Sequence, residues 1–139
     1  MLIYCEKLYD FHDYMLQLLN ELGVESTSDM FQSIGYQRIF MLGFTEKQRD
    51  VNIYFLNFML SVARLCIAKN RQMVKNGISS VNLVQFFRYT LKHYVTYLYI
   101  YCKCTNNFRI FKKKFLENNN IILEDDDILF FSNMNNFIE

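Results

Sequence analysis

Apolar residues recur at intervals of three and four along most of this chain, which is the spacing that places them on one face of an α-helix. The first such run covers residues 4–22 and is amphipathic, because its charged residues fall mostly on the other faces. Gly23 follows at the position where a left-handed cap ends a helix. We therefore predict a helix with one buried face. That face is formed by Leu8, Phe11, Met15, Leu18, Leu19 and Leu22.

The next two predicted helices are separated by a glycine and a capping motif. Residues 30–41 follow a group of N-cap residues and end before Gly43. Thr45 and Gln48 then have the spacing of a capping box ahead of a long helix that extends to residue 75. The first half of this third helix is apolar nearly all round, so we expect that half in the core.

The fourth predicted helix is rich in aromatic residues. Gly77 ends the third helix, and Ser79 or Ser80 is expected to cap the fourth, which covers residues 81–101. Its β-branched and aromatic residues leave a strand near residues 94–102 as an alternative.

The chain changes character toward its end. A short basic helix is predicted over residues 105–117, followed by an asparagine run and an acidic cluster, Glu124 to Asp127, between two apolar patches. Residues 118–139 are expected to form a separate acidic and apolar tail. The predicted fold is therefore all-α, a compact bundle of four to five helices in residues 1–117 with a loosely ordered acidic C-terminal tail.

Composition agrees with a helical, intracellular domain. The 139 residues are 52% hydrophobic, which suffices for one domain with a real core, and they include no proline and only four glycines. Glu6 and Lys7 interrupt the N-terminus before any signal-peptide core could form, so we expect an intracellular location. The longest apolar stretch, residues 53–68, is broken by Asn57 and Arg64 and is shorter than the roughly 20 residues of a membrane span.

Charge is sorted along the chain, although the formal net charge is only +1. Residues 51–115 contain eleven lysines and arginines and no acid, whereas both flanking regions are acidic. This block predicts binding to single-stranded nucleic acid, since its tyrosines and phenylalanines would add base stacking to phosphate contacts. Internal pairing with the acidic ends, and an acidic protein or membrane surface as partner, are the alternatives. The predicted nucleic-acid-binding residues are Arg64, Lys69, Arg71, Lys75, Arg88, Lys92, Lys103, Arg109, Lys112, Lys113 and Lys114, with Tyr89, Tyr97, Tyr99, Tyr101 and Phe108 as stacking candidates.

Groups for catalysis or metal binding are sparse. His12 and His93 are the only histidines, and neither lies in a known nucleophile motif. The four cysteines lack the paired spacing of zinc fingers, and disulfides are not expected inside a cell. The adjacent aspartates 125–127 resemble a two-metal site but lack a further carboxylate from a separate strand. We therefore predict no enzyme activity, no metal and no cofactor.

Four segments carry a further pattern: a cysteine and aromatic opening, an apolar run ending in Gly-Phe, an apolar helix that ends in basic residues, and an aromatic helix followed by basic residues. The segments are Cys5 to Phe11, Ile39 to Phe44, Asn57 to Arg71 and Phe86 to Tyr101. This order resembles the C-terminal region of polyproteins of non-LTR (LINE-type) retrotransposons, downstream of the reverse transcriptase domain. The resemblance implies a helical domain that helps to hold template RNA or target DNA, with Arg64, Lys69 and Arg71 as matched basic positions. The family's zinc-binding spacing is matched only at Cys5.

Two other classes of function remain open. One is a viral or host helical bundle that presents an apolar groove to an amphipathic helix, as viral Bcl-2-like proteins do. The chain has no tryptophan and no Asn-Trp-Gly-Arg-like stretch, which counts against that class. The other is an oligomerising structural domain that docks through the apolar patch at residues 128–131. Strong salt dependence of binding would favour nucleic acid over both.

Overall fold

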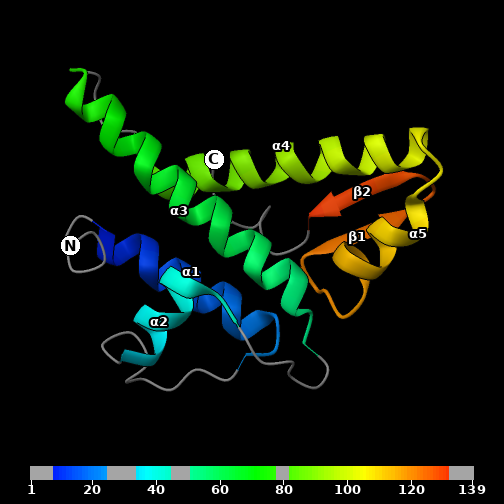
Figure 1. The fold of residues 1–139 in the computed structure, drawn as a ribbon, viewed down its shortest axis with the longest axis horizontal. Helices are drawn as coiled ribbons and strands as arrows, with labels where there is room; N and C mark the ends of the chain where they lie inside the picture. Colours follow the sequence, from blue (N-terminus) through cyan, green and yellow to red (C-terminus); the bar gives the residue numbers. More distant parts are fainter. Residues whose placement is uncertain (1–7, 25–33, 45–50, 78–81, 132–139) are drawn as a thin grey trace.

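The computed structural model describes residues 8–24, 34–44, 51–77 and 82–131, and it is mostly helical, as predicted. Helices α3 and α4 are the longest; α1 and α2 lie on one side of α3, and a small hairpin lies beside the far half of α4 (Figure 1). The elements are α1 (Tyr9–Glu21), α2 (Ile34–Leu42), α3 (Ile53–Lys75), α4 (Leu83–Cys104), α5 (Phe108–Phe111), the π-helical turn η4 (Lys112–Leu116), β1 (Ile122–Asp125) and β2 (Ile128–Phe131).

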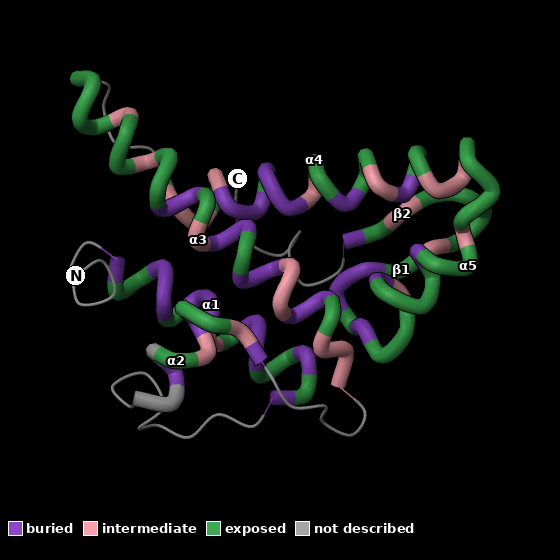
Figure 2. The backbone as a smooth tube through the Cα atoms, viewed as in Figure 1, coloured by how far each residue is buried: buried purple, intermediate pink, exposed green. Residues whose placement is uncertain are grey.

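The core forms where α1, α2, α3 and α4 meet. The predicted apolar face of α1 is buried there, and the first half of α3 is buried with it, as Figure 2 shows in purple. His12 of α1 is fully buried, and its Nδ1 lies 2.6 Å from the hydroxyl of Tyr36 in α2. Burial lowers the pKa of His12 to about 4. The imidazole is therefore a neutral core group at physiological pH.

Helix α3 begins later than predicted. The predicted capping box at residues 45–48 lies outside the described residues, and Asn52 caps the helix instead, because its side-chain oxygen accepts a hydrogen bond from the Phe55 amide at 2.9 Å. The glycines predicted to end the second and third helices do so: Gly43 follows α2 and Gly77 follows α3, each with a positive φ.

Helix α4 also begins at an asparagine. Ser79 and Ser80 lie outside the described residues, and the oxygen of Asn82 accepts a hydrogen bond from the Gln85 amide at 3.2 Å. The helix then continues without a break through residues 94–102, so the alternative of a strand there is wrong. The chain has no proline or glycine in this segment, and its buried side chains follow helical spacing.

The region predicted as a loosely ordered tail contains a β-hairpin. Strands β1 and β2 pair in antiparallel fashion, with Ile122 opposite Phe131 and Asp125 opposite Ile128. Asp126 and Asp127 form the two-residue loop, and both have the positive φ that such loops require. An acidic run of this kind is typical of a solvated segment, so its local pattern does not indicate a hairpin. The predicted helix before it is shortened to α5 and η4.

Candidate nucleic-acid interface

A row of aromatic side chains follows the outer face of α4. Tyr89, His93, Tyr97 and Tyr101 are spaced by four residues, and all are exposed; we call them the tyrosine ladder. The rings of Tyr89 and His93 are stacked with their centroids 6.1 Å apart, and those of Tyr97 and Tyr101 with theirs 6.4 Å apart. Figure 2 shows exposed positions along the edge of α4 that faces away from the rest of the molecule.

The opposite face of α4 holds the ladder in place. Phe87, Leu91, Val95 and Tyr99 have the same four-residue spacing and are buried. They are offset from the ladder by two residues, or about 200° around the helix. Because one face is anchored in the core over its whole length, the other presents its aromatic rings on a rigid support.

The end of α3 supplies the first group of exposed cations. Lys69, Arg71 and Lys75 lie in its second half, which extends beyond the beginning of α4 (Figure 1). All three side chains are exposed. Arg64, earlier in the same helix, is used differently: its guanidinium donates hydrogen bonds to the carbonyl of Phe40 and to the hydroxyl of Ser61. Arg64 therefore ties α2 to α3.

The second group of cations lies at the other end of α4. Arg109 in α5 and Lys112, Lys113 and Lys114 in η4 are all exposed. Lys114 is partly restrained, because its ammonium lies 4.5 Å from the centre of the Tyr54 ring.

The π-helical turn that carries these lysines is held by hydrogen bonds and ring packing on its buried side. The Nδ2 group of Asn52 donates hydrogen bonds to the carbonyls of Lys114, at 2.9 Å, and Glu117, at 2.8 Å. The ring of Phe115 packs edge-on against Phe58, with 5.2 Å between centroids. The same asparagine thus caps α3 and holds η4, a role that the sequence did not indicate.

Lys103 pairs with the acidic hairpin. Its ammonium lies 2.7 Å from Asp127 and 3.4 Å from Glu124, and the Tyr99 hydroxyl donates to the same Glu124 carboxylate at 2.5 Å. The hydrogen bond to Asp127 raises the pKa of Lys103. Internal charge pairing, the alternative use of the basic block, therefore occurs at this position.

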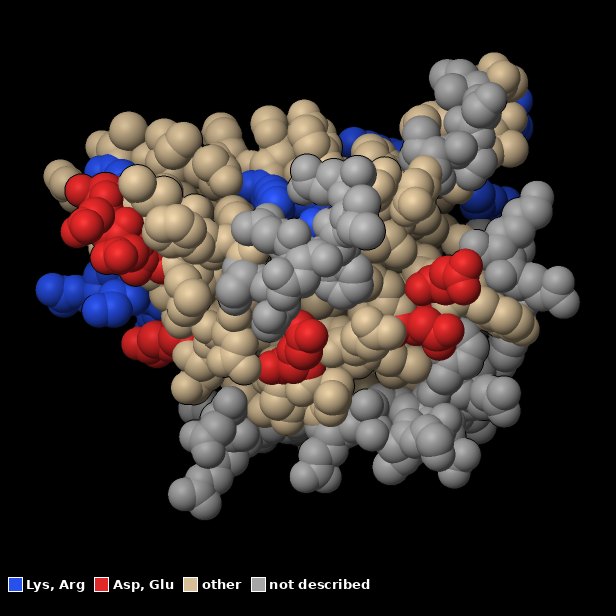
Figure 3. Space-filling model, turned by 180° about the vertical axis from the view of Figure 1, so that it is seen from behind, with Lys and Arg blue, Asp and Glu red and all other residues tan. Residues whose placement is uncertain are grey.

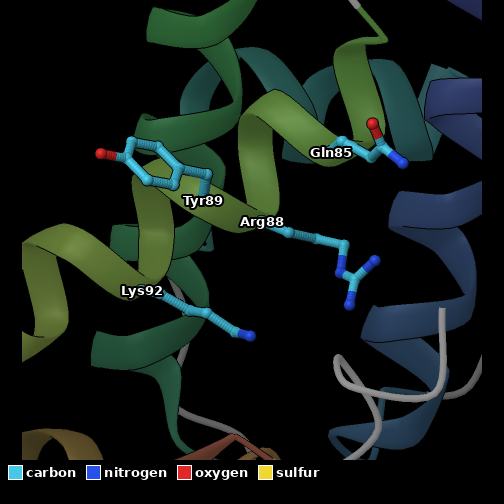
Figure 4. Close-up of a pocket in the computed structure, with 4 residues that line it drawn as sticks. All are labelled: Gln85, Arg88, Tyr89 and Lys92. Carbon is cyan, nitrogen blue, oxygen red and sulfur yellow. The ribbon is translucent and has the colours of Figure 1, made fainter. Parts of the chain in front are cut away.

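The remaining predicted residues lie on the inner side of α4. Arg88 is buried and extends toward α1 (Figure 4), whereas Lys92 is half-buried and its ammonium lies 5.8 Å from the centre of the Phe131 ring in β2. Two of the stacking candidates are also turned inward, since Tyr99 is buried and Phe108 is half-buried. His93 was not predicted, although its place midway between Tyr89 and Tyr97 at four-residue spacing was the signal that could have found it.

The surface shows the resulting charge pattern. Seen from behind in Figure 3, basic groups lie at both ends of the molecule and a smaller one lies near its middle, while separate acidic groups lie along the lower part of this face. Acidic side chains adjoin the basic group at one end, in agreement with the contacts between Lys103 and the hairpin.

Among the described residues, no three His, Cys, Asp or Glu side chains are placed to hold a metal ion, and no helix is long and apolar enough to cross a bilayer.

No family model, curated protein or solved structure matches this chain. The residues of α4 and the charges near its two ends are therefore the features from which a function can be inferred.

Proposed function

We propose that this chain is a non-catalytic helical domain that binds single-stranded nucleic acid along the outer face of α4. The observation that carries the proposal is the tyrosine ladder, which is exposed within a block, residues 51–115, that contains no carboxylate side chain. Every nucleobase offers a π-face, and stacking on an aromatic side chain contributes roughly 1–3 kcal/mol per base. A strand lying along α4 would thus gain affinity at each rung without dependence on sequence.

The positions of the exposed cations agree with such a strand. Helix α4 is about 33 Å long at 1.5 Å per residue, and the exposed basic groups of α3 and of α5 with η4 lie toward its opposite ends (Figure 1). Phosphates at the two ends of a bound strand would meet these groups and release counterions. A duplex would gain less, because the faces of its bases are already stacked on one another.

The resemblance to the C-terminal region of retrotransposon polyproteins implies the same class of ligand. Of its three matched basic positions, Lys69 and Arg71 are exposed and suited to phosphate contact. Arg64 holds α2 against α3, so we assign it a structural part in the interface.

The proposal is tested by fluorescence anisotropy of labelled single-stranded RNA and DNA, and of a duplex, at low and physiological salt. We expect tighter binding of single strands, and affinity that falls steeply as salt rises. The double substitution Lys69→Gln and Arg71→Gln should weaken binding and reduce the salt slope by roughly 0.7 for each phosphate that is no longer neutralised. Arg38→Gln is the matched control, since Arg38 is an exposed cation on α2, away from α4.

The proposal is overturned if single strands do not bind even at low salt, or if Arg38→Gln weakens binding as much as the α3 substitutions. A protein interface would then be the second candidate. It is favoured by exposed apolar side chains near the end of α4, among them Ile100 (55% exposed) and Ile110 (52% exposed). Self-association through that surface would be seen as a molecular mass that rises with protein concentration.

A further inference from the structure

The second half of α3 extends away from the rest of the fold. None of residues 68–77 is buried, and this end of the helix projects beyond α4 (Figure 1). Arg71, Val74 and Lys75 are spaced by three and four residues, so they share one side of the helix; we call them the α3 tip. Val74 is 51% exposed, and neither cation forms an ion pair with a described residue. An apolar side chain and two charges are thus left for a partner to contact.

The outer face of the hairpin is mostly apolar. Successive side chains of a strand point to opposite faces, and the pair Ile122 and Phe131 is buried. The next pair, Leu123 and Phe130, therefore points outward, and each side chain is 48% exposed. Ile128 lies on the same face and is 56% exposed. A solvated face of an antiparallel sheet ordinarily carries polar side chains, so this row of apolar residues suits a docking surface.

The same face ends in negative charge at the hairpin loop. Asp125 lies on it opposite Ile128, and Asp126 follows in the loop. Both are exposed, and neither forms an ion pair with a described residue, whereas the acids on either side of them contact Lys103. The α3 tip has the opposite charge and an apolar side chain of its own. It lies at the other end of the molecule (Figure 1), so the two surfaces cannot meet within one chain, but they can meet between two copies.

We propose that the chain associates with itself head to tail, with the α3 tip of one copy docked on the outer face of the next copy's hairpin. Val74 then lies against the apolar row, and Arg71 and Lys75 lie beside Asp125 and Asp126. Because the contact joins two different surfaces, it leaves one of each free and adds further copies unless a ring closes. The contact is small, and interfaces below about 1,200 Å² are weak, so association requires micromolar or higher concentrations. Phosphates of a bound strand compete for the same two cations, a consequence that rests on the proposed function.

Sedimentation velocity over a concentration series tests the contact. The average mass of the unmodified chain should rise with concentration and should rise less at about 0.5 M salt, where exposed charges are largely screened. Asp125→Lys with Asp126→Lys makes both surfaces positive, and Arg71→Glu with Lys75→Glu makes both negative. Each variant alone should remain monomeric, but an equal mixture of the two should associate again, since every contact then joins opposite charges. Arg38→Glu, a charge reversal on α2 outside both surfaces, should change nothing.

Val74→Ser provides a test that leaves every charge in place. It removes apolar contact from an exposed position, so it should keep the fold but weaken association about threefold to tenfold. Circular dichroism confirms that each variant is folded, and Val74→Ser decides the matter if the hairpin substitutions prevent folding. A mass that stays monomeric at every concentration, or a mixture of the folded charge variants that does not associate, would overturn the proposal.

Addition of a short oligothymidylate separates this proposal from the proposed function. Strand binding that lowers the number of protein copies per particle would support both. Binding that leaves the assembly intact would contradict the competition for Arg71 and Lys75 but not the contact itself. If no strand binds, the proposed function fails, and the dependence of mass on concentration still decides the head-to-tail contact.

Discussion

The two faces of α4 have the same spacing and similar residue types, but one face is buried and the other is exposed to solvent. Phe87 and Tyr99 on the inner face are 0% and 7% exposed, whereas Tyr89 and Tyr97 on the outer face are 69% and 62% exposed. Both rows repeat every four residues, and a shift of two residues separates them. Aromatic content alone therefore does not distinguish core from surface in this helix; the phase relative to α1 and α3 does.

The contrast also shows how the chain combines stability with a binding surface. The inner row contributes burial, and large apolar side chains of this kind each add roughly 1.5–3 kcal/mol when removed from water. The outer row contributes little burial, so its side chains can be changed without loss of the fold. This separation makes the two faces independently testable by substitution.

The largest expected effect comes from the inner face. Phe87→Ala should lower the free energy of unfolding by about 3–5 kcal/mol, because it leaves a cavity where the ring packs edge-on against Phe11, with 5.7 Å between centroids. Tyr89→Ala on the outer face should change that free energy by less than about 0.5 kcal/mol. Urea unfolding monitored by circular dichroism measures both. Equal losses would mean that the two faces are not distinct.

A fall in pH should destabilise the fold through a histidine that is buried in the core. His12 has its pKa lowered to about 4 by burial, so the folded chain keeps it neutral while the unfolded chain protonates it near pH 6.5. The stabilising effect is present above pH 6.5 and is lost as the pH falls toward 4, by about 3 kcal/mol in total. Urea unfolding between about pH 7.5 and 4.5 measures the slope.

His12→Gln should remove that part of the pH dependence. His93→Gln provides the control, since it removes the exposed histidine of the tyrosine ladder and leaves His12 in place. A slope that depends on His93 instead of His12 would contradict the assignment of the two histidines to core and surface.

The smallest expected effect is on single-strand affinity and comes from the ion pair between α4 and the hairpin. Asp127→Asn should remove the 2.7 Å ion pair of Lys103 and leave only its longer, 3.4 Å contact with Glu124. We expect affinity for single strands to increase about two- to fivefold, with little change in stability because the pair is partly exposed. Asp125→Asn removes the same charge from the same hairpin, at another exposed residue. Anisotropy titration distinguishes them, and equal gains would show that only overall charge matters.

Local patterns predicted most of the helices, because these have an apolar row of helical period and a glycine or asparagine at one end or both. They did not predict which cap is used where several stand close together, as with Asn82 and the serines before it. They also missed the hairpin, whose loop places two aspartates, instead of Asn-Gly, in the left-handed region. Such a loop is stabilised by strand pairing and by contact with α4, which no short window of sequence contains.

The candidate interface was predicted in part for the same reason. The charge block identified a stretch of sequence without acids, but its eleven cations were treated as one surface. In the fold Arg64 bonds the carbonyl of Phe40, Arg88 is buried and Lys103 meets the hairpin. The positions that face water toward the two ends of α4 are the ones accessible to a strand. This division depends on helix phase and on contacts between distant segments.

The most direct test of the central claim is single-strand binding by Tyr97→Ala beside Tyr9→Ala. Both side chains are exposed tyrosines, at 62% and 42%, but only Tyr97 belongs to the tyrosine ladder. We predict that Tyr97→Ala lowers single-strand affinity by about tenfold, equivalent to the removal of one stacked base, with unchanged stability. Tyr9→Ala should leave affinity within about twofold. Equal affinities for both variants and the unmodified chain would contradict the account.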